Sequence, residues 1–232
     1  MYIIANGGMK FHDIENTIDA IMLTKNASYV DGVLIDIRLT LDNEIVVFKD
    51  DDLSKTTLSK GFVSKTNYYD LKKVKLPSKI HKYYISTLDE VLRKYQSNKF
   101  IILNLHDSLN KNELLVDKTI RLLNNYPNYN FYLETSSIDI LGYLIEKANG
   151  YKIGPRVMEY PISCTNNISF CDISGNNINE NVNSYREVLV RNINCMEDVT
   201  RFLTSIDNEQ NIFIITDYPK RVNSCVNKSY NS

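Results

Sequence analysis

Short apolar runs alternate with amphipathic stretches along almost the whole chain. The runs are only four to six residues long and are rich in Ile and Val, which is typical of buried strands rather than helices. The stretches between many of them place apolar residues three and four positions apart, which predicts helices with one buried face. Nine strands are expected, at residues 2–5, 33–37, 45–48, 100–105, 131–135, 153–157, 168–173, 187–191 and 212–216.

The predicted helices follow the strands in turn. They begin at residue 18 and cover 88–95, 114–123, 138–145 and 196–203, and Thr87 and Glu90 form a capping box at the start of one of them. Alternating strands and helices predict the α/β class, and a (β/α)8 TIM barrel with one run lying outside it fits best. Residues 1–222 are expected to form a single domain and 223–232 a frayed tail. Residues 162–185, rich in Asn and Ser, predict a long loop or a weak strand.

Composition and charge exclude several kinds of partner. Of the 232 residues, 43% are hydrophobic and 24% charged, and the net charge of −1 argues against a nucleic-acid binder. No apolar run approaches the roughly 18 residues of a membrane span, and no secretory segment is recognised at the start. Four cysteines without CxxC spacing predict free thiols and a cytoplasmic location: Cys164, Cys171, Cys195 and Cys225.

Short motifs stand at the strand ends and helix starts in a definite order. They are Asn6-Gly7-Gly8, Glu15-Asn16-Thr17, the run 31–36, the run 46–50, the helix start 86–92, the pair Asn104 and His106, and Thr216-Asp217-Tyr218-Pro219. This order and spacing resemble the glycerophosphodiester phosphodiesterase family over nearly the whole chain. That family shows, in the same order, His-Arg-Gly, Glu-Asn-Thr, Glu-x-Asp, His-Asp, a Thr-Leu-x-Glu helix start, Glu-x-Lys and Thr-Asp-x-Pro. The resemblance implies a phosphodiesterase-like TIM barrel.

The resemblance also implies a reaction, hydrolysis of glycerophosphodiesters by two histidines around a divalent metal. Asn6 and Lys49 stand at the two histidine positions and are the candidate catalytic residues. Asp36 is the candidate metal ligand, while Leu34 and Asn104 occupy the other two metal-ligand positions. A hard cation requires several oxygen ligands, so no cofactor is expected, and Mg²⁺ or Ca²⁺ is implied by the resemblance alone.

Three further residues are candidates for substrate binding: Glu15, Asp50 and His106. Each has a structural alternative, because Glu15 could cap its own helix, Asp50 could belong to a solvated turn, and His106 could pair with Asp36. Lys49 is the other candidate partner of Asp36. Two arginines near later strand ends, Arg156 and Arg191, could contact an anion or lie on the surface.

Three functions are compatible with these residues. Loss of both histidines and two metal ligands predicts a pseudoenzyme that retains at most recognition of a small phosphodiester or polyol-phosphate ligand. The alternative is an active hydrolase in glycerophospholipid or envelope-polymer metabolism whose re-tooled site uses Lys49, Asp36 and His106. A third hypothesis has the Tyr-rich segment 67–84 dock a protein partner, although a solvated loop explains its composition equally well. The sequence leaves the oligomeric state open.

Overall fold

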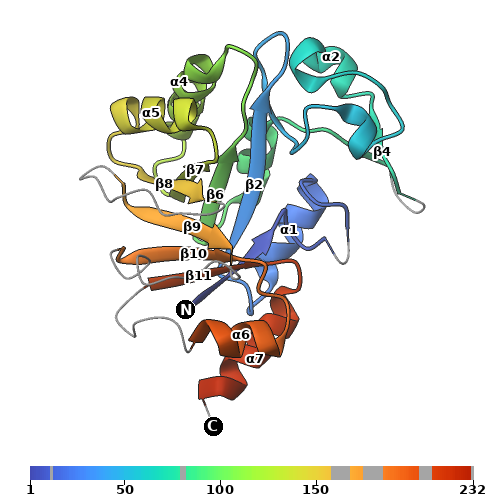
Figure 1. Ribbon diagram of the computed structural model, residues 1–232. Coiled ribbons are helices and arrows are strands. Elements are labelled where there is room, and N and C mark those ends of the chain that lie inside the picture. Colours follow the sequence, from blue (N-terminus) through green and yellow to red (C-terminus); the bar gives the residue numbers. More distant parts are fainter. Residues whose placement is uncertain (11–12, 79–81, 158–167, 175–184, 204–210, 231–232) are drawn as a thin grey trace.

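Eight parallel strands close into a barrel in the computed structural model (Figure 1), which describes residues 1–10, 13–78, 82–157, 168–174, 185–203 and 211–230. The barrel strands are β1 (Tyr2–Asn6), β2 (Gly32–Leu39), β6 (Phe100–Leu105), β7 (Asn130–Thr135), β8 (Lys152–Val157), β9 (Phe170–Ser174), β10 (Glu187–Arg191) and β11 (Asn211–Thr216). Their order is β1-β11-β10-β9-β8-β7-β6-β2, and pairing of β2 with β1 closes the barrel. The predicted (β/α)8 barrel is therefore confirmed.

One predicted strand lies outside the barrel, as the count of nine required. It is β3 (Ile45–Val47), which pairs antiparallel with the end of β2. Five short elements follow β3 before the chain returns to the barrel. They are two 3-10 helices (Leu53–Lys55 and Val63–Lys65), α2 (Tyr68–Leu71), and the two-residue strands β4 (Lys75–Leu76) and β5 (Tyr83–Tyr84). Segment 67–84 thus has more structure than a plain solvated loop in its described residues, because Leu71, Leu76 and Tyr83 pack into a small core together with residues of β3 and of the two 3-10 helices.

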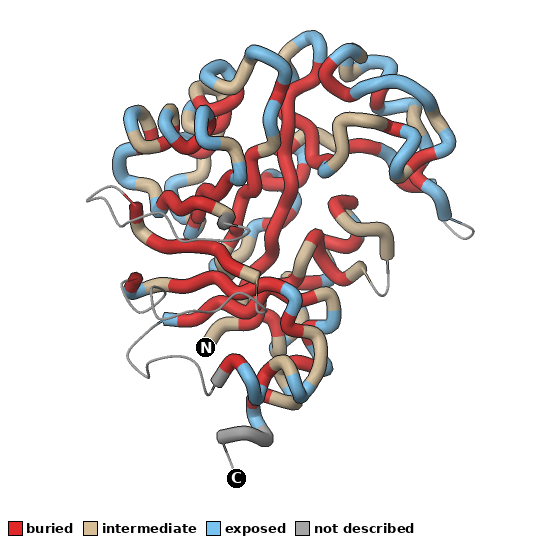
Figure 2. The backbone as a smooth tube through the Cα atoms, in the orientation of Figure 1, coloured by how far each residue is buried: buried red, intermediate tan, exposed pale blue. Residues whose placement is uncertain are grey.

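Helices cover the outside of the barrel in two groups. One half is covered by α1 (Ile18–Asn26), α3 (Leu88–Tyr95), α4 (Asn112–Leu123) and α5 (Ile138–Lys147), and the other by α6 (Met196–Leu203) and α7 (Pro219–Tyr230). The capping box of Thr87 and Glu90 is present at α3. Figure 2 shows the strands buried along most of their length and the exposed positions on the helices and loops. No helix of the described residues is long and apolar enough to span a membrane.

The expectation of a frayed tail at residues 223–232 is wrong for residues 223–230, and residues 231–232 lie outside the described part of the chain. Residues Pro219–Tyr230 form α7, which Pro219 begins because its fixed φ suits the first helical turn. Val222 and Val226, four positions apart on one helix face, are buried against the core that α6 and the neighbouring strands form. Burial of this face stabilises a helix that is predominantly polar elsewhere. The predicted loop 162–185 lies in part outside the described residues, and its described part includes β9.

Apolar side chains fill the barrel interior from the amino ends of the strands to their middle. Eight buried residues form this interior core: Ile4, Leu34, Ile102, Tyr132, Phe170, Leu189, Phe213 and Ile215. Side chains two positions further along several of these strands point inward as well, because strand side chains alternate between two faces. These next positions are polar, so the apolar filling gives way to a polar layer at the carboxyl ends of the strands.

Candidate ligand site at the carboxyl ends of the strands

Asp36 is the centre of a hydrogen-bond network at the end of β2. His106 Nε2 lies 2.7 Å from Asp36 Oδ1, and the Asn104 amide donates to the same oxygen at 2.8 Å. The Asn16 amide donates to the other carboxylate oxygen at 2.9 Å, and its own oxygen accepts the Asp36 backbone N–H at 3.0 Å. Of the two pairings expected for Asp36, the structure contains the one with His106, whereas Lys49 forms no ion pair with it.

The environment of Asp36 keeps its carboxyl group ionised. Burial by itself would raise the pKa of Asp36, since a low-dielectric surrounding disfavours the charge. The hydrogen bond and charge of His106, followed by the amides of Asn16 and Asn104, outweigh burial and hold the pKa well below its ordinary value. Asp36 is therefore a buried anion with three N–H donors already in place.

The intact Glu15-Asn16-Thr17 motif has a structural explanation. Thr17 is the N-cap of α1, where its hydroxyl accepts the Ala20 N–H at 3.2 Å. Asn16 adopts a left-handed backbone conformation, φ +58°, and connects the loop before α1 to β2 through Asp36. Glu15 does not cap the helix as one alternative had it, and its carboxylate instead pairs with Lys10 at 3.2 Å.

Asn6, at a position where the family has a histidine, holds a carboxylate in place. Its amide donates to Asp217 Oδ1 at 2.9 Å, and Lys10 Nζ lies 2.6 Å from the same oxygen. Between the two, the chain turns through Gly8 with φ +92°, where a Cβ would lie 2.6 Å from a carbonyl oxygen of α1. Burial disfavours the charge of Lys10, but its carboxylate partners raise its pKa above the ordinary value. An amide has no titratable proton, so Asn6 can position Asp217 but cannot shuttle a proton.

A buried triad of charges occupies the opposite side of the polar layer. Arg191 is only 8% exposed, which rules out the surface alternative, and its Nε donates to Asp172 at 2.5 Å while its Nη2 binds Glu134. Burial and the nearby Asp172 raise the pKa of Glu134 well above its ordinary value, although Arg191 acts in the opposite direction. Glu134 Oε2 and Asp172 Oδ1 accept no hydrogen bond from the described residues. A proton on Glu134 would satisfy both oxygens.

The triad leads to a testable expectation for Glu134→Gln. The glutamine NH2 can donate to Asp172 while its carbonyl keeps the bond from Arg191, so the free energy of unfolding at neutral pH should change by no more than about 1 kcal/mol. Because the folded-state pKa of Glu134 is raised, its contribution is complete below the unfolded pKa of about 4.3 and is lost as pH rises through the folded value. The variant should therefore lose less stability than wild type as pH rises.

Urea unfolding at several pH values between 4 and 9 measures this difference. Glu146→Gln, on the exposed face of α5, is the matched control and should follow wild type at every pH. A Glu134→Gln curve parallel to that of wild type would show that Glu134 is ionised in the folded protein throughout.

Lys49 lies at the rim of the site with its side chain exposed. Its backbone carbonyl accepts a bond of 2.7 Å from Arg38 Nη2, and Arg38 in turn pairs with Asp51 at 3.2 Å. Asp50 lies 3.8 Å from Lys55, consistent with a solvated turn. Arg38 was not foreseen from the sequence, although it points inward by the same alternation that places Asp36 there.

A cavity of about 210 Å³ brings several of these residues together. Its lining comprises Asn6, Lys10, Asp36, Lys49, Arg156, Arg191, Asn192, Asn194, Ile215 and Asp217. Both candidate catalytic positions and the candidate metal ligand are therefore in one place. Two of the candidate substrate-binding residues lie behind the lining of this cavity: His106 contacts Asp36, and Glu15 contacts Lys10. Asp50 lines a separate open depression beside it, together with Arg38 and His106.

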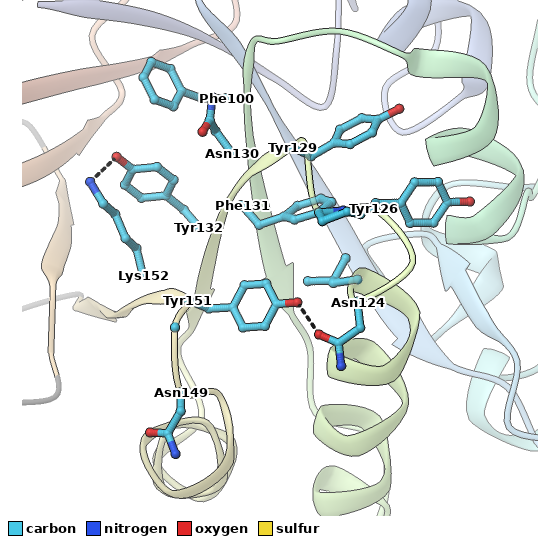
Figure 3. Close-up of a pocket in the computed structure, with 13 residues that line it drawn as sticks. Phe100, Asn124, Tyr126, Tyr129, Asn130, Phe131, Tyr132, Asn149, Tyr151 and Lys152 are labelled. Carbon is cyan, nitrogen blue, oxygen red and sulfur yellow. Dashed lines mark hydrogen bonds between the residues drawn. The ribbon is translucent and has the colours of Figure 1, made fainter.

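A larger groove of about 480 Å³ lies at the other ends of the strands. It is formed at the starts of β6, β7 and β8, and Figure 3 shows its aromatic side chains, among them Tyr129 and Tyr151. The Tyr151 hydroxyl donates to Asn124 at 2.9 Å, and Lys152 donates to Tyr132 at 2.9 Å. Ligand sites of TIM barrels lie at the carboxyl ends of the strands, so the smaller cavity is the candidate site.

The residues at the family's metal positions do not fit a divalent cation. Leu34 is fully buried in the apolar interior and offers no oxygen, and the Asn104 amide is turned to donate to Asp36. No group of three His, Cys, Asp or Glu side chains in the described part of the chain is arranged to hold a metal ion. Ca²⁺ and Mg²⁺ need several oxygen ligands at 2.0–2.6 Å, and one carboxylate surrounded by N–H donors does not provide them.

The closed barrel of eight parallel strands places the chain in the class of TIM-barrel proteins, and its polar cavity lies at the carboxyl ends of the strands, the face where ligand sites of this class occur. Residues 6–163 match the model of the glycerophosphoryl diester phosphodiesterase family, and the chain belongs to this family.

Two curated relatives and two solved structures show the extent of the similarity. The Bacillus subtilis (strain 168) protein named "Putative glycerophosphodiester phosphodiesterase YhdW" is 34% identical over 109 residues, 45% of this chain and 44% of that protein. An uncharacterised Mycoplasma genitalium protein is 29% identical over 160 residues, 66% of this chain and 67% of its own length. The chain thus aligns with about half to two thirds of these relatives.

Among solved structures, an Oleispira antarctica phosphodiesterase in complex with the product sn-glycerol-3-phosphate superposes with a TM-score of 0.85 at 21% identity, over 98% of this chain and 97% of that one. The glycerophosphodiester phosphodiesterase of Thermotoga maritima superposes with a TM-score of 0.74 at 20% identity, over 95% and 96%. At these identities the likeness shows the fold.

Proposed function

We propose that this chain is a catalytically impaired member of the family, acting in the cytoplasm, that retains recognition of a phosphodiester or polyol-phosphate ligand. The observation that carries the proposal is the engagement of Asp36 by Asn16, Asn104 and His106. Both oxygens of this carboxylate already accept hydrogen bonds from side chains, so Asp36 is arranged to stabilise the fold rather than to coordinate a metal ion.

The two positions that carry acid and base in the family support the same proposal. Asn6 is bonded to Asp217 and has no proton to exchange, and Lys49 lies at the rim of the site with its side chain exposed. Loss of one positioned acid or base typically costs 10²–10⁴-fold in rate. Recognition is supported by the polar cavity, which the same residues line, and by the product seen in the Oleispira antarctica structure.

Hydrolysis of glycerophosphocholine with Mg²⁺ or Ca²⁺ present tests the proposal. Wild type and Lys49→Met should release product at the same background rate, because neither has a working acid and base. Lys49→Met is a suitable control since its side chain is exposed and its packing role is small. Turnover by wild type clearly above that of Lys49→Met would overturn the proposal in favour of an active site re-tooled around Lys49.

A further inference from the structure

Some of the charged side chains that line the 210 Å³ cavity have partners of opposite charge, and others have none among the described residues. Each carboxylate has a cationic or amide partner, because Asp36 is bonded to His106 and Asp217 to Lys10. Arg191 likewise has its two carboxylates inside the barrel. Two cations remain, Lys49 from the segment after β3 and Arg156 from the end of β8, and neither forms an ion pair within the described part of the chain. Arg156 is partly exposed and its charge acts on Glu134 from a distance only.

We propose that Lys49 and Arg156 bind the dianionic phosphate group of a small polyol phosphate in this cavity, without a divalent cation. The inference rests on the proposed function and names the ligand class of the same site. It follows from the observation that the residues at the metal-ligand positions do not suit the divalent metal that the family resemblance implies. Where a metal would neutralise phosphate charge, the cavity has two side-chain cations, Lys49 and Arg156, that form no ion pair with any residue the structure describes.

The charge of the ligand favours a monoester over a diester. A phosphate monoester carries about −1.5 to −2 at pH 7, because its second pKa is about 6, whereas a diester carries a single charge. The two cations, which form no ion pair in the described part of the chain, therefore match the monoester. An arginine guanidinium can donate to two phosphate oxygens at once, and a lysine ammonium adds a point charge.

The amides of the lining suit the polyol part. Asn192 and Asn194 follow β10, and the Asn194 side-chain oxygen already accepts the Thr216 hydroxyl at 2.8 Å, which leaves its NH2 for a ligand hydroxyl. The Asn194 side chain is thereby fixed in orientation before any ligand binds. A volume of about 210 Å³ lies below the roughly 300–1,000 Å³ of sites for drug-sized ligands. The cavity is therefore suited to a small polyol rather than to a long substituent.

Isothermal titration calorimetry with the full chain tests the inference. The probes are sn-glycerol 3-phosphate, inorganic phosphate and glycerophosphocholine, each in EDTA and again in Mg²⁺. Glycerol phosphate should bind with the same Kd in both buffers, inorganic phosphate several-fold more weakly, and the diester about tenfold more weakly. Lys49→Gln and Arg156→Gln should each raise the Kd for glycerol phosphate by about tenfold, the size expected for a lost bond to a charged group. Lys60→Gln, on an exposed loop outside the lining, should leave it unchanged.

Each other outcome overturns a stated part of the inference. Binding that requires Mg²⁺ would show that the site holds a metal ion. Equal affinities for inorganic phosphate and glycerol phosphate would show that the polyol part of the ligand contributes nothing to binding. A diester that binds more tightly than the monoester, or variants that bind as wild type does, would refute the assigned ligand class or residues and leave the proposed function standing. Absence of binding by all three probes would refute the inference, while the hydrolysis assay decides the catalytic part of the proposed function independently.

Discussion

Replacement of Arg191 by methionine is expected to lower the free energy of unfolding by about 3–5 kcal/mol, since removing one partner of a buried ion pair leaves uncompensated charge. The guanidinium lies between Asp172 and Glu134, both fully buried, and donates to each. Methionine fills a similar volume but offers no donor, so the change isolates the electrostatic contribution. Urea unfolding at pH 7, followed by circular dichroism, measures the loss.

A surface arginine provides the matched control for this variant. Arg93→Met breaks an i,i+4 pair with Asp89 at 2.7 Å, in which the arginine side chain is 73% exposed. Exposed ion pairs contribute little to stability because water screens them, so the control should unfold at nearly the same urea concentration as wild type. The loss in Arg191→Met should also shrink as pH falls, because Glu134, whose pKa burial and the nearby Asp172 raise, then becomes neutral and no longer needs a cationic partner. Equal losses in the two variants would refute a buried charge triad.

Asp36→Ala is expected to cost about 3 kcal/mol, the second largest effect. The change removes the acceptor of three hydrogen bonds and leaves the Asn16 NH2 buried without its acceptor, at about 1–3 kcal/mol for an orphaned group. The Asn104 NH2 also loses its bond to Asp36 and keeps only the contact with His106 Nε2 at 3.1 Å. Asp70→Ala, which breaks an exposed pair with Lys73, should cost less than 1 kcal/mol.

The pH dependence of this effect distinguishes a charged Asp36 from a neutral one. The folded-state pKa of Asp36 is depressed, so its stabilising contribution is complete above the unfolded pKa of about 3.9 and is lost as pH falls toward the folded value. The difference between wild type and Asp36→Ala should therefore shrink as pH falls below about 4. A difference that grows on acidification would mean that Asp36 stabilises the fold in its protonated form.

Most strands and helices could be predicted from the sequence alone, because the spacing of apolar residues matches the two-residue repeat of a strand or the 3.6-residue repeat of a helix. Strand and helix positions follow from apolar spacing, and the capping residues around Thr87 mark the start of α3. The tail was mispredicted for a related reason. The apolar stripe of α7 consists of few residues, and its helix is stabilised by contact with α6, which no local window contains.

The candidate site was predicted only in part. The resemblance located Asp36, Asn6 and Lys49, and all three line one cavity. It did not identify Glu134 and Asp172, although the two-residue alternation along β7 and β9 carries a signal for both, since each is the polar position after an inward apolar one. Which inward side chains then touch depends on the shear of the closed barrel, which is a property of all eight strands together.

What the sequence by itself determined is the order of strands and helices, the inward and outward faces of each strand, and which residues stand at the positions of the family's motifs. Only the tertiary structure decided the partners of the charged groups. Asp36 is bonded to His106 and not to Lys49, and Arg191 is buried between two carboxylates rather than exposed. The physical reason is that periodicity is a property of neighbouring residues, whereas a buried charge is stabilised by groups that barrel closure brings within a few ångströms from distant parts of the chain.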